Sequence, residues 1–193
     1  LIKSRKSKKF REETIWSFFI QVCLGVKYLH DHNIIHRDIK TSNIFIEKNT
    51  KIILGDFGIC KILNNNTDLT RTQIGTPLYI SPEIINNTKY SFGVDIWSLG
   101  CLLFELINLI PPFMAKNIKS LNTKILNCEF QKNVINNNIY SQPLLKLVQE
   151  ILIICEKNRL TIDQILDKKE IKEYIDKFSV LKLISKPIPN FDL

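Results

Sequence analysis

The chain has 193 residues, 45% of them hydrophobic and 24% charged, which is typical of one globular domain with a sizeable core. Its formal net charge of +8 would suit a nucleic-acid partner, but no alternation of Arg with aromatic residues indicates such binding. The basic residues are spread out except in segment 3–11, which we interpret as a solvated linker. Nucleic acid is therefore not an expected partner.

The first predicted helix covers residues 12–31, where apolar residues recur at helical spacing behind two acids in the first turn. His30 and His32 end this helix. No Cys or carboxylate cluster surrounds them, so we expect an exposed helix C-terminus and not a metal site.

A short buried strand is predicted at residues 34–35, followed by the polar stretch 36–43, which reads H-R-D-I-K-T-S-N. Segments 44–46 and 51–54 predict a hairpin around a turn at 47–50. The sequence G-D-F-G follows at residues 55–58.

Residues 62–74 are polar, rich in Asn and Thr and without periodicity, so we expect a mobile loop. G-T-P-L-Y-I-S-P-E follows at residues 75–83. A buried helix is predicted at 92–109, with Asp95 placed in its first turn to cap it.

Further helices are predicted in the C-terminal half, with a polar loop at 133–140 and a tail at 185–193. Their ranges are 118–126, 141–154, 161–166 and 169 to about 184. The longest apolar run, residues 99–112, is shorter than the about 20 residues that span a bilayer, so no membrane partner is expected. The five cysteines show no C-x-x-C pair or metal-ligand spacing, which favours free thiols and a cytoplasmic protein, with the nucleus as the alternative.

Four motifs in this order resemble the catalytic core of eukaryotic protein kinases. They are H-R-D-I-K-x-x-N at 36–43, D-F-G at 56–58, S-P-E at 81–83 and D-x-W-S-x-G at 95–100. Alone, the first could be a polar loop and the second a turn, but the ordered set favours a kinase. Segments 36–45, 55–61 and 74–84 are similar to the NIMA-related (NEK) group, and the similarity runs from about residue 10 to about residue 180. Lys40 with Gly75-Thr76 resembles the serine/threonine class.

The resemblance implies a mainly α fold, α+β in class, in which a small β-hairpin forms the floor of a kinase large C-terminal lobe. Residues 1–184 would be this partial kinase domain, since the sequence holds no G-x-G-x-x-G and no V-A-I-K of an N-terminal lobe. The implied cofactors are ATP and Mg²⁺, and the implied partner is a protein substrate with a Ser or Thr hydroxyl. We expect residues 1–193 alone to be inactive. The alternative is a non-catalytic lobe that docks partner proteins.

The resemblance also implies a role for each motif residue. Asp38 would accept the substrate proton, Lys40 would neutralise the transferring phosphoryl group and bind the nucleotide, and Asn43 and Asp56 would hold Mg²⁺. Thr72 is the candidate for activation-loop phosphorylation. The supporting residues are Arg37, Thr76, Glu83, Asp95 and Arg159. The resemblance implies that Arg159 pairs with Glu83 and that Asp95 also hydrogen-bonds the backbone of the loop at 36–43. Leu160 stands where kinases usually have a Pro after this last Arg.

Overall fold

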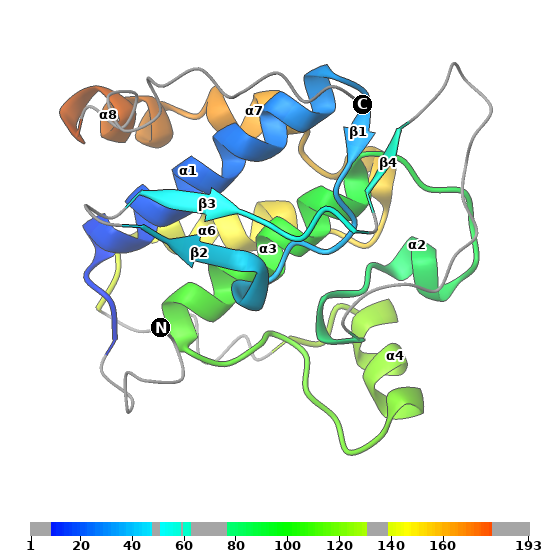
Figure 1. Ribbon diagram of the computed structural model, residues 1–193. Coiled ribbons are helices and arrows are strands. Elements are labelled where there is room, and N and C mark those ends of the chain that lie inside the picture. The colour runs from blue at the N-terminus through cyan, green and yellow to red at the C-terminus, as the bar shows by residue number, and fades with distance from the viewer. Residues whose placement is uncertain (1–8, 48–50, 59, 63–76, 131–138, 179–193) are drawn as a thin grey trace.

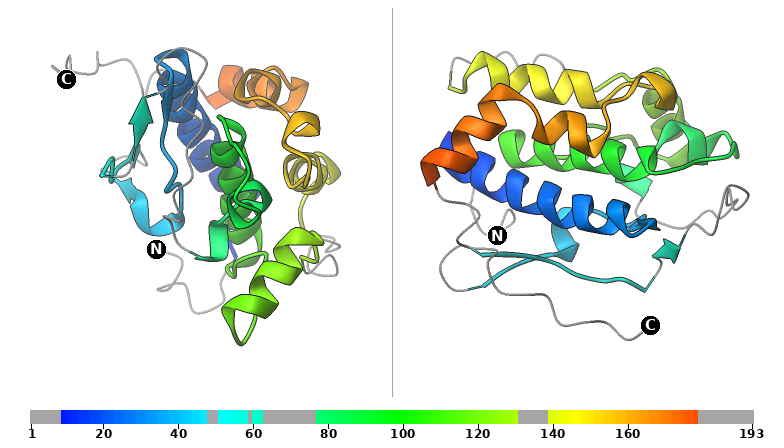
Figure 2. Two further views of the ribbon diagram at one scale, coloured as in Figure 1. Left: turned by 90° about the vertical axis from the view of Figure 1, so that its right-hand side faces the viewer. Right: turned by 90° about the horizontal axis from the view of Figure 1, so that it is seen from above.

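The computed structural model of the chain describes residues 9–47, 51–58, 60–62, 77–130 and 139–178. Two long helices, α1 (Glu12–Asp31) and α3 (Gly93–Asn108), cross the middle of the molecule (Figure 1). The short strands lie on one side of these two helices, and α6 (Gln142–Ile151), α7 (Ile162–Leu166) and α8 (Lys169–Phe178) lie on the other (Figure 2). One core cluster joins all three layers.

Both central helices were predicted from their patterns, and the structure confirms them. In α1 the repeated apolar residues face the core, whereas in α3 every residue from Val94 to Asn108 is buried. Helix α3 begins one residue later and ends one residue earlier than predicted. Leu109 caps its end with a left-handed φ of 63°, and the Leu109 N–H donates to the Glu105 carbonyl at 2.7 Å.

The predicted hairpin is formed by β2 (Ile44–Ile46) and β3 (Ile52–Leu54), with Ile44 opposite Leu54. A second antiparallel pair joins β1 (Ile34–Ile35) to β4 (Lys61–Ile62). The sequence did not predict β4, and its Ile62 was placed in a loop. A two-residue strand is too short to show an alternating pattern, and its partner lies far back in the chain.

The other elements support this framework. They are α2 (Pro82–Ile85), α4 (Ile118–Leu126), α6, α7 and α8, with single 3₁₀ turns η2 (Thr41–Asn43), η4 (Pro77–Tyr79) and η5 (Glu156–Asn158). Helix α6 ends at Ile151, three residues before the predicted end, because Leu152 leaves helical geometry. Thr161 caps α7 in a capping box with Gln164. The segment 179–193, most of the predicted loop 133–140 and most of the predicted loop 62–74 lie outside the described residues.

None of the described helices is both long and apolar enough to cross a membrane.

The contact between α3 and α6 depends on a residue without a side chain. A Cβ on Gly100 would lie 2.7 Å from Ile151 Cγ2 and 2.8 Å from Leu152 Cδ2. We therefore expect Gly100→Ala to lower the free energy of unfolding by about 1–3 kcal/mol, measured by urea denaturation.

Gly25→Ala in α1 is the matched control for that variant. Its Cβ would meet Leu54 Cδ2 at 3.9 Å, an ordinary contact, so the better helix propensity of Ala should raise stability by about 0.5–1 kcal/mol. Equal effects of the two substitutions would contradict the close-packing argument.

Candidate active site

The polar loop between β1 and β2 brings three of the predicted residues together. The carboxylate oxygen Oδ2 of Asp38 accepts a hydrogen bond from Lys40 Nζ at 2.5 Å and one from Asn43 Nδ2 at 2.8 Å. Asn43 Nδ2 also donates to the backbone carbonyl of Asp38 at 2.9 Å. Asp38 and Asn43 are buried, so these bonds fix both side chains in place. These donors leave Oδ1 of Asp38 for other partners, and Oδ1 of Asn43, which accepts a long hydrogen bond from the Ser42 hydroxyl at 3.4 Å, has a second lone pair for a ligand.

Asp56 follows the partner strand at the same end of the hairpin. The N–H of Gly55 donates to the Asn43 carbonyl at 2.9 Å, which places the D-F-G segment beside the polar loop. The side chain of Asp56 is exposed, and its backbone has a left-handed φ of 63°. Only the Gly58 N–H, at 3.4 Å from Oδ1, contacts this carboxylate among the described residues. Asp56 thus presents oxygen atoms next to Asn43.

His36 packs beneath the D-F-G segment and is not placed to act as a base. Its ring lies 5.3 Å from that of Phe57, and its Nδ1 accepts a hydrogen bond from the Asp38 N–H at 3.3 Å. Burial lowers the pKa of His36, although the nearby Asp95 carboxylate opposes this effect. A neutral imidazole suits the acceptor role of Nδ1.

Asp95 holds the start of the polar loop from the central helix. Its Oδ1 accepts the Arg37 N–H at 2.8 Å, and its Oδ2 accepts the His36 N–H at 2.9 Å. The expected contact with the loop backbone is therefore confirmed. The expected cap is wrong, because no side chain caps α3 at its start: the carboxylate of Asp95 is directed to the loop instead.

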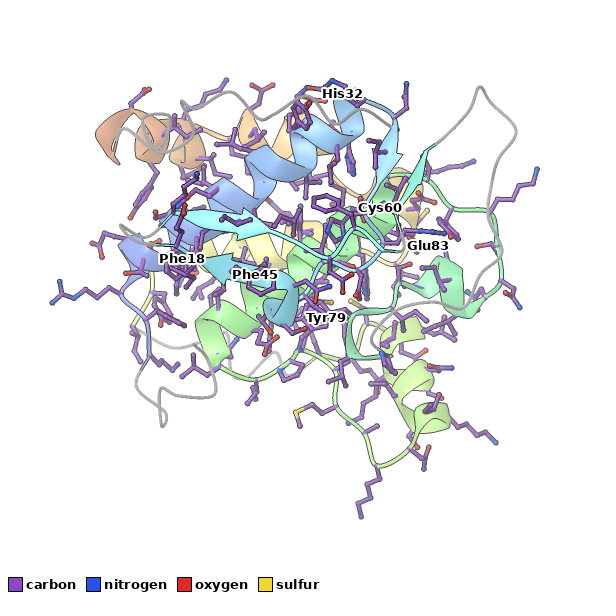
Figure 3. The ribbon with its side chains drawn as sticks, in the orientation of Figure 1. Phe18, His32, Phe45, Cys60, Tyr79 and Glu83 are labelled. Carbon is purple, nitrogen blue, oxygen red and sulfur yellow. The ribbon has the colours of Figure 1, made fainter. Side chains whose placement is uncertain are left out.

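His30 is a second correction, since we expected it to be exposed. Its side chain is 7% exposed, and its Nε2 lies 2.9 Å from Asp95 Oδ2. A carboxylate can only accept, so Nε2 carries the proton. His30 also packs against Phe92, with ring centroids 4.5 Å apart. His32 is exposed at the end of α1, as predicted (Figure 3).

Glu105 is a residue that the sequence analysis did not identify as part of the site. This buried acid of α3 accepts a hydrogen bond from the Tyr79 hydroxyl, and the Thr41 hydroxyl lies 3.4 Å from both of its oxygens. It therefore joins the polar loop to η4, in which Tyr79 is labelled in Figure 3. The one available signal was an isolated acid inside the apolar run 99–112.

The predicted pair of Glu83 and Arg159 is formed and buried. The guanidinium binds both carboxylate oxygens, at 2.8 and 3.2 Å, and donates to the backbone carbonyls of Gly93, Ile153 and Ile154. Its Cζ atom also lies 5.1 Å from the centre of the Trp97 ring. This saturated network forms although Leu160 replaces the usual Pro.

Arg37 has the other strained backbone of the site, with φ at 67°. Its guanidinium contacts the Tyr90 hydroxyl at 3.5 Å and the Cys60 carbonyl at 3.4 Å. Thr72 and Thr76, the two predicted site residues of the activation segment, lie outside the described residues.

The oxygen donors here suit a hard cation held jointly with phosphates. The described residues include no cluster of three His, Cys, Asp or Glu that could hold a metal ion. Mg²⁺ commonly takes one or two carboxylates and completes its shell with water and phosphate oxygens. The amide of Asn43 and the exposed carboxylate of Asp56 fit that donor set.

Comparisons with known proteins agree with the resemblance seen in the sequence. A family model of the protein kinase domain matches residues 1–170. The chain is 41% identical to serine/threonine-protein kinase Nek1 of Mus musculus over 184 residues, which cover 95% of the chain and 15% of that protein. It is 40% identical to Nek5 of Homo sapiens, with 95% and 26% covered, and 35% identical to Nek2 of Homo sapiens, with 91% and 40% covered. The chain thus spans less than half the length of these relatives.

The Asp95 network should contribute measurably to stability. Asp95→Asn replaces one of two buried acceptor oxygens by a donor, which would face the N–H of His36 or Arg37. We expect a loss of about 1–3 kcal/mol in the free energy of unfolding, measured by urea denaturation. Asp31→Asn is the control, because its ion pair with Lys27 is exposed and should cost less than about 0.5 kcal/mol. Similar losses for both variants would refute the network's role.

Glu156 gives a pH-dependent prediction. Its carboxylate accepts the Ser91 N–H at 3.0 Å, and burial, with Glu83 nearby, raises its pKa. A raised folded-state pKa stabilises the fold fully below the unfolded value of about 4.3, and this stabilisation is lost as pH rises through the folded value. Glu156→Gln keeps the acceptor and removes the charge.

The Glu156→Gln variant should therefore have a larger free energy of unfolding than the unaltered protein at pH 7. The gain should be less than about 1 kcal/mol, because this side chain is half-exposed, and it should vanish below about pH 4. Urea denaturation at both pH values measures this, with the exposed Glu173→Gln as control. A gain that is the same at both pH values would contradict the assignment.

Proposed function

Because the chain belongs to the protein kinase family, we propose that it is the large C-terminal lobe of a NEK-like serine/threonine kinase domain, with residues 1–184 as the lobe and 185–193 as a tail. The helical body, with its hairpin at one face, supports this proposal. So does the absence of a Gly-rich loop and a V-A-I-K strand from the sequence. Protein kinases act on protein hydroxyls with ATP and Mg²⁺.

The observation that carries the proposal is the cluster of Asp38, Lys40 and Asn43. Lys40 and Asn43 hold Oδ2 of Asp38, so the carboxylate has a fixed orientation. Asp38 would then accept the proton of a substrate Ser or Thr hydroxyl through its other oxygen. The ammonium group of Lys40 lies within 2.5 Å of this carboxylate, where it would offset negative charge on the transferring group.

The nucleotide site would be completed by Asn43 and Asp56. Mg-ATP supplies the γ-phosphoryl group when it is bound. Asn43 donates through Nδ2 to Asp38, and its Oδ1, which accepts the Ser42 hydroxyl at 3.4 Å, would offer its second lone pair to Mg²⁺. Asp56 offers an exposed carboxylate from the neighbouring segment. Lys40 is the one positively charged residue among Asp38, Lys40, Asn43 and Asp56, and it would bind the phosphates of the nucleotide. Each of these roles rests on the geometry of the loop and on the family resemblance.

An exposed apolar surface beside the site supports the interpretation of this chain as one of the two lobes of a kinase domain. Phe45 is 55% exposed, Phe57 48% and Ile53 42%, and all three belong to the hairpin or the D-F-G segment. Phe45 is labelled on β2 in Figure 3. Large apolar groups that gather at one face usually mark a contact surface. We attribute this face to contact with a small lobe and with the base of the nucleotide.

A phosphate on Thr72 would regulate the site by adding negative charge to the activation segment. Arg37 would be its partner, because it belongs to the loop that carries Asp38. Thr76 would hydrogen-bond with Asp38 and Lys40. A non-catalytic docking lobe is the weaker alternative, since such a module has no need for a complete set of Asp38, Lys40, Asn43 and Asp56.

A kinase assay tests the proposal on two proteins. Residues 1–193 alone should transfer no radiolabelled phosphate from Mg-ATP to a protein substrate. In this chain joined to the N-terminal lobe of a NEK kinase, Asp38→Asn should lower kcat by about 100- to 10,000-fold because the proton acceptor is lost.

Asp31→Asn, on the exposed end of α1, is the control and should leave kcat unchanged. Transfer by residues 1–193 that disappears in Asp38→Asn would refute the inactivity of the lobe alone. A complete domain that is inactive with Asp38 intact would favour the docking module.

A further inference from the structure

Gln21 is a buried polar residue of α1 that lies outside the loop and the hairpin of the candidate active site. It is 7% exposed. Its Nε2 donates to the Ser17 carbonyl at 3.2 Å and lies 3.3 Å from the Ser17 hydroxyl oxygen. Its Oε1 accepts the N–H of Ile52, in β3, at 2.9 Å. Because an amide nitrogen donates and cannot accept, this orientation of the side chain is the one that satisfies both neighbours.

The N–H of Ile52 can reach α1 because it points away from β2. At the turn end of the hairpin, the Glu47 N–H donates to the Lys51 carbonyl. Antiparallel strands alternate between hydrogen-bonded and non-hydrogen-bonded pairs, so Ile52 and the opposite residue Ile46 form a non-hydrogen-bonded pair. The N–H of Ile52 therefore lies on the outer edge of the hairpin, along which α1 runs (Figure 1, Figure 2).

The residue two positions further along β3 contacts α1 one helical turn further on. A Cβ on Gly25 would lie 3.9 Å from Leu54 Cδ2, so Leu54 packs over this glycine. Two residues of a strand cover about 6.6 Å and four residues of a helix about 6 Å, so β3 follows α1 in step. The apolar contact at Gly25 has no preferred direction, whereas the hydrogen bond of Gln21 has one. Gln21 therefore fixes the position of β3 along the helix.

The position of β3 decides where Asp56 lies. Asp56 follows the strand by two residues, and the Gly55 N–H between them donates to the Asn43 carbonyl at 2.9 Å. A slide of β3 by two residues along α1 would move Asp56 by about 7 Å relative to the loop at 36–43, which Asp95 holds from α3. The anchor of β3 on α1 thus sets the distance between Asp56 and Asn43.

We propose that Gln21 is a positioning residue for the candidate active site. It holds β3 on α1 so that Asp56 lies beside Asn43, where the two can share one Mg²⁺. This inference rests on the proposed roles of Asn43 and Asp56 as Mg²⁺ ligands. Gln21 acts on them indirectly, through the backbone of β3.

Three variants separate positioning from general stability. Gln21→Leu keeps a similar size and removes the acceptor. Gln21→Glu keeps an acceptor for Ile52, and when protonated in this buried place it can also donate to Ser17. Val148→Ala, in α6 on the other side of the central helices, removes buried apolar contacts and is the matched control for lost stability.

Hydrogen exchange of the full chain, followed by mass spectrometry, measures the anchor. Gln21→Leu should speed exchange in residues 51–58 relative to exchange in α3 by about tenfold or more, because Ile52 loses its acceptor and the strand opens locally. Gln21→Glu should stay within about threefold of the unaltered chain. Val148→Ala should leave the ratio between the two segments unchanged.

Mn²⁺, a cation that takes the same oxygen ligands as Mg²⁺, reports on the site without phosphoryl transfer. In the unaltered chain, added Mn²⁺ should broaden the backbone NMR signals of Asn43 and Gly58 over the same range of concentration, and Asp56→Asn should abolish this effect. Gln21→Leu should raise the Mn²⁺ concentration at half-broadening by about tenfold. Gln21→Glu and Val148→Ala should change it by less than about threefold.

Two results would overturn the inference alone. One is an equal change of the exchange ratio in Gln21→Leu and Val148→Ala, which indicates a purely structural role. The other is an unchanged Mn²⁺ concentration at half-broadening in Gln21→Leu. A failure of Mn²⁺ to broaden Asn43 and Gly58 together in the unaltered chain would instead contradict the proposed metal site, and the inference with it.

Discussion

The buried carboxylate of Asp95 is the constraint on which the geometry of the candidate active site depends. A fully buried charge is costly unless hydrogen bonds satisfy it, and here three donors do so: the backbone N–H groups of His36 and Arg37 and the imidazole of His30. Asp95 belongs to a helix that is buried almost throughout. The loop at residues 36–43 is thereby positioned from the centre of the core, and the bonds from Lys40 and Asn43 then orient the carboxylate of Asp38.

The same contact explains how the loop maintains a strained backbone. Arg37 has a left-handed φ, which is unfavourable for a residue with a Cβ, and it stands between His36 and Asp38. Asp95 accepts the N–H groups of His36 and of Arg37, and the N–H of Asp38, after the bend, donates to His36 Nδ1. Asp56 has the same kind of strain, and the bond from the Gly55 N–H to the Asn43 carbonyl anchors it. The two strained residues lie beside the groups proposed to carry out the chemistry, where strain is commonly retained for function.

Sequence patterns predicted what is local, and they failed where the partner is distant. Helix α1, helix α3 and the hairpin were predictable because their periodicity covers enough residues. Asp38, Lys40 and Asn43 were predictable because one short motif holds all three. The buried position of His30 was not predictable, because its partner lies 65 residues away. Glu105 was missed for the same reason: Thr41 and Tyr79 precede it by 64 and 26 residues, and nothing local identifies them as partners.

Helix α3 makes contacts with every part of the candidate site that the structure describes around it. Asp95 near its start holds the loop at residues 36–37, Glu105 near its end contacts Thr41 and Tyr79, and its first carbonyl, at Gly93, binds the Arg159 that pairs with Glu83. One buried helix therefore orients the loop at residues 36–43 and the segment that ends in S-P-E. This helix positions the loop that carries the proposed proton acceptor, and Lys40 and Asn43 within that loop orient its carboxylate. Tight binding of the nucleotide phosphates needs more contacts than Lys40, Asn43 and Asp56 provide, directly or through Mg²⁺. We therefore assign that task to a second lobe.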